Sequence, residues 1–574
     1  MGEVRAMRPD IADFYNGVST GAPRLLCPVP SDSGQGWLFC VYAPNARRVQ
    51  VLGDWNGWDL YSAAELSRYE DGLWRGKAPD AREGQLYKYN ILCADGCWRL
   101  RTDPFAVGYE PSAVAAARLM RLPCPPPPWS CPAGPDSPLR IYELHAGSWR
   151  RHWDGRYYDF DALADRLIPW VAGQGFTHIE LMPPAEYPFD GSWGYQLTGY
   201  FAPSARFGDA ERFVHLVERC HEAGVGVLAD FVPAHFAPDD GALVWFDGSP
   251  LYEAGPSDWG SLAFDLASGP VRSFLLSAAC RWVGDYGCDG LRVDAVGWAL
   301  RRWPGGEAAS FFRLLTSTLH ARFPGVVLIA EDSLPGCPSA APIEAGGLGF
   351  DYVWEAAPLR ELAGTLSRPF GTRGEGPILA PEGGRCIQAF SHDDCALPGG
   401  ALLPRMYGDP ARQFAQARLF LLYQAALPGK QLLFSGCEFG QQSPFDPGRE
   451  PDWHLLAGED HRALADYCGA LGQFYAAHPA LFCQDGSARW QILANGPVRA
   501  WLRSARGETL LCLFHLEPWD RPGVTLDLGK LGWRGWMREV FASGAARPLP
   551  PVWVEDGRLT LDLPGFCAAV LTWE

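Results

Sequence analysis

The sequence predicts an α/β protein with a central (β/α)₈ barrel of the TIM type, an N-terminal β-sandwich module and a C-terminal β-domain. Three observations lead to this prediction. The chain has 574 residues, too many for one core, because domains usually hold about 100–250 residues. Short β-rich segments dominate both ends. The middle of the chain alternates between short apolar strands and amphipathic helices.

The N-terminal module is expected over residues 1–122 as an all-β sandwich. Three short β-rich runs, Trp37–Tyr42, Val49–Leu52 and Tyr87–Leu92, are separated by turn residues. A proline-rich segment follows over residues 123–139. Because proline fixes φ and lacks an N–H group, this segment cannot form a helix interior or a central strand. We expect it to be a stiff linker between domains.

The barrel is expected over residues 140–484, where eight strand candidates alternate with helical patterns. The strand candidates are Ile141–His145, Thr177–Met182, Val225–Val232, Gly290–Asp294, Val326–Glu331, Phe350–Trp354, Cys386–Ser391 and Gln431–Ser435. An open doubly wound sheet is the alternative, but no glycine-rich phosphate loop follows any of these strands. After residue 485, β-rich runs such as Val498–Leu502, Thr509–Leu516 and Leu559–Leu563 predict a C-terminal β-domain over residues 485–574.

The composition narrows the classes of function. The chain has 49 Lys+Arg against 66 Asp+Glu, a net charge of −17, which disfavours binding to nucleic acid or to an anionic membrane. Its 24 Trp suit a sugar-binding protein, although tryptophan also fills protein cores. The chain shows no signal peptide or transmembrane segment, and its 17 Cys form no CxxC pairs. We therefore expect reduced thiols and a cytoplasmic location.

Carboxylates follow several of the predicted barrel strands. Asp230 ends the third strand, Asp294 the fourth and Glu331 the fifth, and Asp393 follows the seventh. A single Asp after a strand is commonly a helix cap, but four strand ends meet at one rim, where barrel active sites lie. Because buried carboxylates without partners are unfavourable, such a cluster indicates function. Arg292 faces the same side of its strand as Asp294 and is expected to keep that group ionised.

Paired carboxylates are the groups that retaining glycosyl transfer requires. One attacks the anomeric carbon, and the other protonates the departing oxygen and then deprotonates the incoming hydroxyl, at a separation of about 5–5.5 Å. Asp294 and Glu331 follow adjacent predicted strands and are the candidate pair.

The four strand ends resemble the signature regions of the α-amylase superfamily. The resemblance implies that Asp294 is the nucleophile, Glu331 the general acid/base and Asp393 the third catalytic carboxylate. The residues that it assigns to substrate binding are Tyr195, Gln196, Asp230, His235, Arg292 and His392.

Longer segments resemble the 1,4-α-glucan branching enzymes. They are Glu180–Pro183, Phe189–Pro203, Pro233–Phe236, Pro428–Gln441 and Asp452–Leu456, and Tyr42–Asn45 and Gly53–Trp58 resemble the carbohydrate-binding-type module of those enzymes. The resemblance implies cleavage of an α-1,4 bond and transfer of the chain to a 6-hydroxyl, with α-1,4-glucan, such as glycogen or amylose, as both donor and acceptor. It also implies that Tyr195 stacks on the transferred sugar.

Four rim side chains are expected to help hold the acceptor: Trp193, Tyr195, Gln196 and Trp453. We expect a monomer. We also expect no metal, nucleotide or redox cofactor, because no zinc-type ligand spacing or phosphate loop occurs.

Departures from the branching-enzyme pattern keep two alternatives open. The stretch between Asp294 and Glu331 is shorter than usual, Asp332 follows the acid/base, and residues 394–400 replace the usual continuation after Asp393. One alternative is a hydrolase of the same superfamily, either trehalose-releasing or debranching. The other is a non-catalytic glucan-binding protein, which the complete set of carboxylates disfavours. The partition between transfer and hydrolysis depends on how the loops exclude water.

Overall fold

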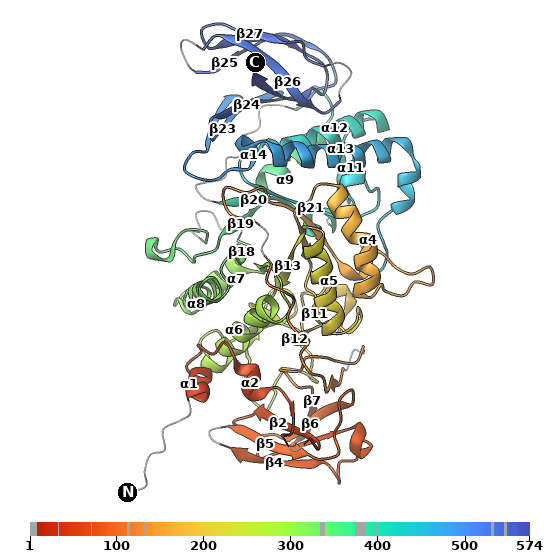
Figure 1. Cartoon of the computed structure of the whole chain (residues 1–574), viewed down its shortest axis with the longest axis vertical. Coiled ribbons are helices and arrows are strands. Elements are labelled where there is room, and N and C mark those ends of the chain that lie inside the picture. The colour runs from red at the N-terminus through yellow and green to blue at the C-terminus, as the bar shows by residue number, and fades with distance from the viewer. Residues whose placement is uncertain are drawn as a thin grey trace.

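The computed structural model has three parts in a row, with the N-terminal β-structure at one end, the barrel in the middle and the C-terminal β-domain at the other end (Figure 1). The structure describes residues 9–32, 34–69, 72–111, 115–129, 132–332, 339–373, 385–396, 400–529, 533–544 and 548–574.

Eight parallel strands form the closed central barrel, each paired with its neighbours in the chain and the last with the first. These strands are β9 (Arg140–Leu144), β10 (His178–Leu181), β13 (Gly226–Phe231), β17 (Gly290–Val293), β18 (Val327–Ala330), β19 (Tyr352–Glu355), β20 (Cys386–Phe390) and β21 (Lys430–Phe434). All eight predicted strands are confirmed, and the open doubly wound alternative is wrong.

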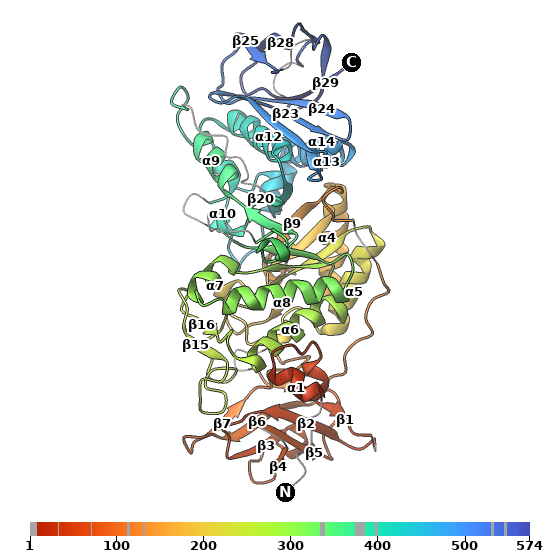
Figure 2. The same cartoon turned by 90° about the vertical axis from the view of Figure 1, so that its left-hand side faces the viewer.

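Helices surround this barrel (Figures 1 and 2). The longer ones are α4 (Phe160–Gly173), α5 (Ala210–Glu222), α6 (Gly269–Gly284), α8 (Glu307–Arg322), α9 (Ala357–Leu366), α12 (Pro410–Ala426) and α13 (Glu459–Ala477). The shorter ones are α3 (Ala146–Trp149), α7 (Val296–Arg302), α10 (His392–Ala396), α11 (Leu402–Arg405) and α14 (Pro479–Phe482). Asp159, Asp209 and Asp409 fix where α4, α5 and α12 begin, because each side chain accepts a backbone N–H from the first turn.

Small sheets shape the rim of the barrel. One pairs β11 (Ala185–Glu186) with β12 (Gly199–Pro203). The other has the order β14–β16–β15 and consists of β14 (His235–Phe236), β15 (Glu253–Pro256) and β16 (Leu262–Phe264). Both lie in loops that follow the second and third barrel strands.

The N-terminal part begins with helices, so the expectation that it is entirely β is wrong. Its first elements are α1 (Pro9–Tyr15) and α2 (Ala22–Leu26). Ile11 and Phe14 are buried, and the Ser273 hydroxyl of α6 donates to the Phe14 carbonyl at 2.9 Å. This segment therefore packs against a barrel helix, where its apolar side chains leave water.

An antiparallel sheet of eight strands follows, with the order β1–β2–β5–β4–β3–β6–β7 and with β8 against β6. The strands are β1 (Val29–Pro30), β2 (Trp37–Tyr42), β3 (Arg48–Gly53), β4 (Ala64–Tyr69), β5 (Leu73–Ala78), β6 (Leu86–Leu92), β7 (Trp98–Arg101) and β8 (Ala117–Arg118). The Asn45 backbone N–H donates to Asp247 at 2.8 Å, and Arg101 donates to the Phe246 carbonyl at 3.0 Å. These bonds attach the sheet to a barrel loop.

The described residues of the proline-rich segment form no helix or strand. Trp129 stacks on His221 of α5 with ring centroids 4.1 Å apart, so the segment runs along the barrel. Residues 130 and 131 of the predicted linker lie outside the described residues. Among the helices that the structure describes, none combines the length and the apolar character needed to cross a bilayer.

The C-terminal domain is β-rich, as expected. Its six-stranded sheet has the order β22–β23–β24–β29–β26–β27, and β25 pairs with β28. The strands are β22 (Arg489–Ala494), β23 (Val498–Ala505), β24 (Glu508–His515), β25 (Arg521–Asp527), β26 (Gly535–Ala542), β27 (Val552–Val554), β28 (Arg558–Leu563) and β29 (Ala568–Trp573). Buried Arg499 pairs with Glu361 of α9 at 2.8 Å, and the Trp501 indole N–H donates to the Ala426 carbonyl at 2.9 Å. The sheet is thereby fixed to the barrel helices.

Candidate active site

The predicted catalytic residues meet at the carboxyl end of the barrel strands. Val293 and Ala330 are register partners on β17 and β18, so Asp294 and Glu331 come directly after them on adjacent strands. Asp230 of β13 is the register partner of Arg292 on β17. The parallel register thus brings residues far apart in the sequence to one point of the rim.

Arg292 is the centre of this cluster. Its buried guanidinium donates to Asp294 at 2.7 Å and to Asp230 at 2.8 Å, and its Nη2 lies 3.1 Å from Glu331 Oε2. The Trp354 ring lies 4.2 Å from the guanidinium carbon and covers the other side of the group. One cation therefore contacts three carboxyl groups and offsets much of their mutual repulsion.

The two central carboxyl groups have opposite pKa shifts. Burial alone favours the neutral acid, but Arg292 and the hydrogen bond from His235 lower the pKa of Asp294 to about 2. Burial raises the pKa of Glu331 to about 7 despite Arg292, and the charge of Asp294 adds to the rise. At neutral pH one group is an anion while a large share of the other is a protonated acid. This combination allows one carboxylate to attack while the other donates a proton.

The turn after Asp294 is strained. Ala295 has a φ of 55°, in the left-handed region that residues with a Cβ disfavour. Its backbone N–H donates to Glu331 Oε2 at 2.9 Å. The unusual conformation therefore aims a donor at the neighbouring carboxyl group, as strained residues at functional sites often do.

The residues predicted to bind substrate form the wall next to this pair. Tyr195 donates its hydroxyl proton to Asp230 at 2.7 Å and stacks on the His392 ring with centroids 5.3 Å apart. His235 Nε2 lies 3.4 Å from Asp294. Asp393 lies 3.6 Å from His392 Nε2, and about half of its side chain is exposed.

Gln196 takes a different place from its neighbour Tyr195. Gln196 is half-buried, and its side-chain amide donates to the backbone carbonyl of Trp259 at 3.2 Å. Gln196 therefore connects two rim loops, whereas Tyr195 faces the carboxylate cluster.

Glu143 is a site residue that the sequence analysis missed. This fully buried carboxylate accepts the backbone N–H of His392 at 2.9 Å and contacts its Nδ1 at 2.5 Å. Burial alone lowers the pKa of a histidine, but Glu143 raises that of His392 to about 9. His392 is therefore held in its charged form and in one orientation. The sequence did contain a signal for this residue, because Glu143 lies near the end of the first predicted barrel strand, Ile141–His145.

The expectation that Trp453 helps hold an acceptor is wrong. Its ring is buried, its indole N–H donates to the Trp149 carbonyl at 2.8 Å, and it stacks on Phe439 with centroids 4.9 Å apart. Its large apolar ring instead packs beneath the loop that carries it.

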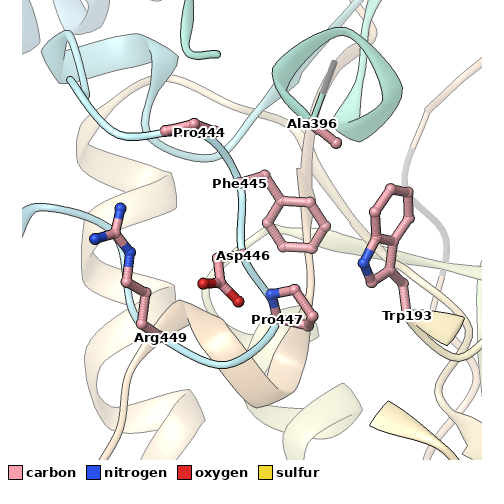
Figure 3. A pocket seen from close by; sticks show the side chains of 7 residues that line it. All are labelled: Trp193, Ala396, Pro444, Phe445, Asp446, Pro447 and Arg449. Atoms are coloured by element: carbon pink, nitrogen blue, oxygen red, sulfur yellow. The ribbon is translucent and has the colours of Figure 1, made fainter. Parts of the chain in front are cut away.

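Trp193 lines a pocket of about 280 Å³ next to His392. Figure 3 shows the Phe445 ring facing Trp193, with Asp446 and Arg449 on the other side of the loop. The ring centroids of Phe445 and Trp193 are 5.3 Å apart. The residues that line the pocket are Trp193, Ala396, Pro444, Phe445, Asp446, Pro447 and Arg449.

Residues 397–399, part of the unusual stretch after Asp393, lie outside the described residues. Among those that the structure describes, no group of three His, Cys, Asp or Glu is arranged to hold a metal ion.

Comparison with known proteins identifies the family. Residues 26–106 match the model of Carbohydrate-binding module 48 (Isoamylase N-terminal domain). The chain is 39% identical over 563 residues to the 1,4-alpha-glucan branching enzyme GlgB of Ralstonia nicotianae, covering 88% of this chain and 71% of that protein. The chain belongs to the 1,4-α-glucan branching enzyme family. Another family member, from Dechloromonas aromatica, is 38% identical over 90% of both chains, and one from Rubrobacter xylanophilus is 40% identical over 88% of this chain and 76% of that protein.

Solved structures share the fold of this branching-enzyme family member. The catalytic module of the glycogen-degrading pneumococcal virulence factor SpuA has a TM-score of 0.75 at 17% identity and covers 96% of this chain and 97% of that chain. Apo pullulanase from Paenibacillus barengoltzii has a TM-score of 0.76 at 18% identity, covering 96% and 94%. At this low identity the likeness establishes the architecture alone.

Proposed function

We propose that this chain is a 1,4-α-glucan branching enzyme, which cleaves an α-1,4 bond with retention and transfers the released chain to a 6-hydroxyl of a glucan. The observation that carries the proposal is the pairing of ionised Asp294 with the acid form of Glu331 around Arg292. The identity of more than a third with the branching enzymes of three bacteria supports the same conclusion.

In the first step Asp294 attacks the anomeric carbon of the donor while Glu331 protonates the departing 4-oxygen. A bond forms between the Asp294 carboxylate and that carbon as the bond to the 4-oxygen breaks. In the second step Glu331, now a carboxylate, takes the proton of the acceptor 6-hydroxyl. The oxygen of that hydroxyl replaces Asp294 at the anomeric carbon, so the configuration is retained.

The remaining site residues bind and orient the donor sugar. His235, Asp393 and the charged form of His392 offer hydrogen bonds to its hydroxyl groups, and Asp393 stabilises the positive charge of the transition state. Tyr195 provides an aromatic face for the sugar ring, fixed by its hydrogen bond to Asp230 and its contact with His392. Gln196 acts indirectly, because it holds the loop of Trp259.

Transfer competes with hydrolysis of the covalent intermediate. Water is abundant, but a hydroxyl held in place reacts with an effective concentration of about 10⁵ M or more. The rim loops therefore decide the outcome by binding the acceptor and excluding water.

We further propose a monomer with domains over residues 1–122, 140–484 and 485–574, joined by the linker at 123–139. The three carboxylates and Arg292 all belong to one barrel, so the proposed chemistry requires no residue from a second copy. The cysteines that the structure describes are not paired in disulfides, which supports the reducing environment of the cytoplasm. Light scattering and limited proteolysis test the assembly and the domain boundaries.

The test of the proposed function is incubation with amylose. We expect the iodine colour to fall and α-1,6 anomeric signals to rise in the NMR spectrum while reducing ends stay nearly constant. A debranching enzyme of the isoamylase type should then release short chains from the product. Reducing ends that increase in step with the bonds cleaved would instead identify a hydrolase.

A further inference from the structure

An exposed tryptophan lies on the rim within reach of the catalytic carboxylates. Trp259 is in the loop between β15 and β16, and 48% of the residue is exposed. Its ring centroid lies 4.8 Å from that of His235, whose Nε2 is 3.4 Å from Asp294. A single side chain therefore separates this solvent-facing ring from the carboxylate predicted to be the nucleophile.

The Trp259 ring is held in place from behind. Trp298 of α7 is 8% exposed and packs against it with ring centroids 5.1 Å apart. The Trp298 indole N–H donates to Asp258 at 2.8 Å, and Gln196 donates to the Trp259 carbonyl at 3.2 Å. The ring is thus an aromatic face fixed before any ligand binds, which lowers the entropy cost of binding.

The position of Glu331 decides which part of the substrate meets this face. The acid/base group must touch the oxygen that leaves and, later, the hydroxyl that enters, so both lie on its side of the donor sugar. Glu331 follows β18, and Trp259 lies in the connection from β13 to β17. Trp298 belongs to the connection from β17 to β18, directly before Glu331 in the barrel.

The other aromatic group of the rim belongs to a different part of the site, the pocket that Trp193 and Phe445 line. Trp193 follows β10 and Phe445 follows β21, and the two strands flank β9 in the closed barrel. Their pocket adjoins His392, and its lining includes no residue of the loops after β13 and β17 (Figure 3 shows the lining residues). Because His392 is assigned to the donor sugar, we expect the transferred part of the donor toward Trp193, in place of the acceptor role that the sequence suggested for this residue. The Trp259 side is then left for the acceptor.

We propose that Trp259, fixed by Trp298 and Asp258, is the platform on which the acceptor glucan stacks. The indole covers the C–H face of an acceptor glucose and so brings a 6-hydroxyl to Glu331 while displacing water from the same space. Trp259 then sets the share of the covalent intermediate that passes to sugar instead of water. The inference rests on the proposed function and names the residue that gives it acceptor specificity.

The test uses α-maltosyl fluoride as donor and maltohexaose as acceptor, with the full-length chain. The leaving group of this donor is fluoride and not a sugar, so the rate of fluoride release measures how fast the covalent intermediate forms. The ratio of transfer products to hydrolysis products then measures how the intermediate divides between sugar and water. We expect Trp259→Ala to release fluoride at nearly the wild-type rate without acceptor. Its ratio of transfer to hydrolysis should fall about tenfold, the change that about 1.4 kcal/mol produces.

Two further variants complete the experiment. Trp298→Phe keeps an aromatic ring but removes the bond to Asp258, so it should raise the half-saturating acceptor concentration by less than Trp259→Ala does. Trp519→Ala is the matched control, because Trp519 is 50% exposed and belongs to the C-terminal domain. Its partition should equal that of the wild type.

Two outcomes would overturn the inference alone while wild-type transfer remains normal. In the first, Trp259→Ala gives the wild-type partition at every acceptor concentration. In the second, fluoride release without acceptor falls as strongly as transfer does, which would assign the ring to the fold of the site. A wild-type enzyme that only hydrolyses the donor would overturn the proposed function and this inference with it.

Discussion

The Arg292 guanidinium lies 2.7 Å from the Asp294 carboxylate, and a second nitrogen of the same group lies 3.1 Å from Glu331. Arg292 thus serves two carboxyl groups whose pKa values lie far apart, about 2 and about 7. The hydrogen bond from His235 adds to the effect of Arg292 and lowers the pKa of Asp294 further. For Glu331, burial and the charge of Asp294 outweigh Arg292 and the backbone N–H of Ala295, so its pKa rises. This arrangement gives the two groups distinct tasks at one pH.

Removal of either group should abolish turnover but not binding. Asp294→Ala and Glu331→Gln are each expected to lower kcat on amylose by about 10³-fold or more, because each group acts mainly in the transition state. Affinity electrophoresis in amylose-containing gels should show nearly unchanged mobility. Asp332→Asn is the control next to Glu331 and should retain more activity. A tenth of wild-type turnover in either catalytic variant would contradict the assignment.

The pH dependence should report the acid form of Glu331. Because this group must donate a proton to the leaving oxygen, kcat/KM on amylose should fall as pH rises through about 7. Asp294 stays ionised down to about pH 2, so it contributes no loss of activity just below neutral pH. With α-maltosyl fluoride the leaving group needs no proton, and the loss near pH 7 should disappear from kcat/KM. A basic limb that is the same for both substrates would argue against this role.

Glu143 should stabilise the fold through His392 in a pH-dependent way. The pKa of His392 is raised from about 6.5 to about 9 in the folded state. The stabilisation is therefore complete below about pH 6.5 and is lost as pH rises through 9. Glu143→Gln should lower the thermal midpoint by about 2–4 °C at pH 6, with a smaller effect above pH 9. Glu65→Gln, which affects an exposed pair with Arg48, should show no such trend. An effect of Glu143→Gln that stays constant with pH would contradict the pairing.

Ala295 should tolerate glycine better than a neighbouring helical alanine does. The left-handed conformation costs a residue with a Cβ about 1–2 kcal/mol, which glycine avoids, while glycine loses about 0.5–1 kcal/mol to chain entropy. Ala295→Gly should therefore keep or slightly raise the thermal midpoint but lower kcat, since Glu331 loses a firmly placed donor. Ala299→Gly inside α7 should lower the midpoint. Equal destabilisation by both changes would show that Ala295 stores no strain.

The sequence was sufficient to predict the barrel because its signals are local. Each strand is a short apolar run, and Asp294 and Glu331 stand at the ends of two such runs. Once eight strands are parallel, the rim position of those residues follows from geometry. The short helices α1 and α2 were missed because 7 and 5 residues are too few to show a helical period.

Contacts between distant segments could not be predicted in the same way. Glu143 and His392 are 249 positions apart, and only the closure of the barrel brings them together. Trp453 and Trp259 both stand in polar loops, yet one is 8% and the other 48% exposed. Neither the burial of Trp453 nor the support of Trp259 by Trp298 is visible in a local pattern, because both depend on how separate loops pack.

The most direct test of this account is to trap the covalent intermediate. The Glu331→Gln variant should be incubated with 5-fluoro-α-maltosyl fluoride, whose leaving group needs no acid and whose ring fluorine slows both steps. Digestion and mass spectrometry should then find one maltosyl group of the analogue on the peptide that contains Asp294, with fragmentation that places it on that carboxylate. The additional variant Asp294→Ala should remain unlabelled. A label on any other residue, or a label that survives the loss of Asp294, would contradict the account.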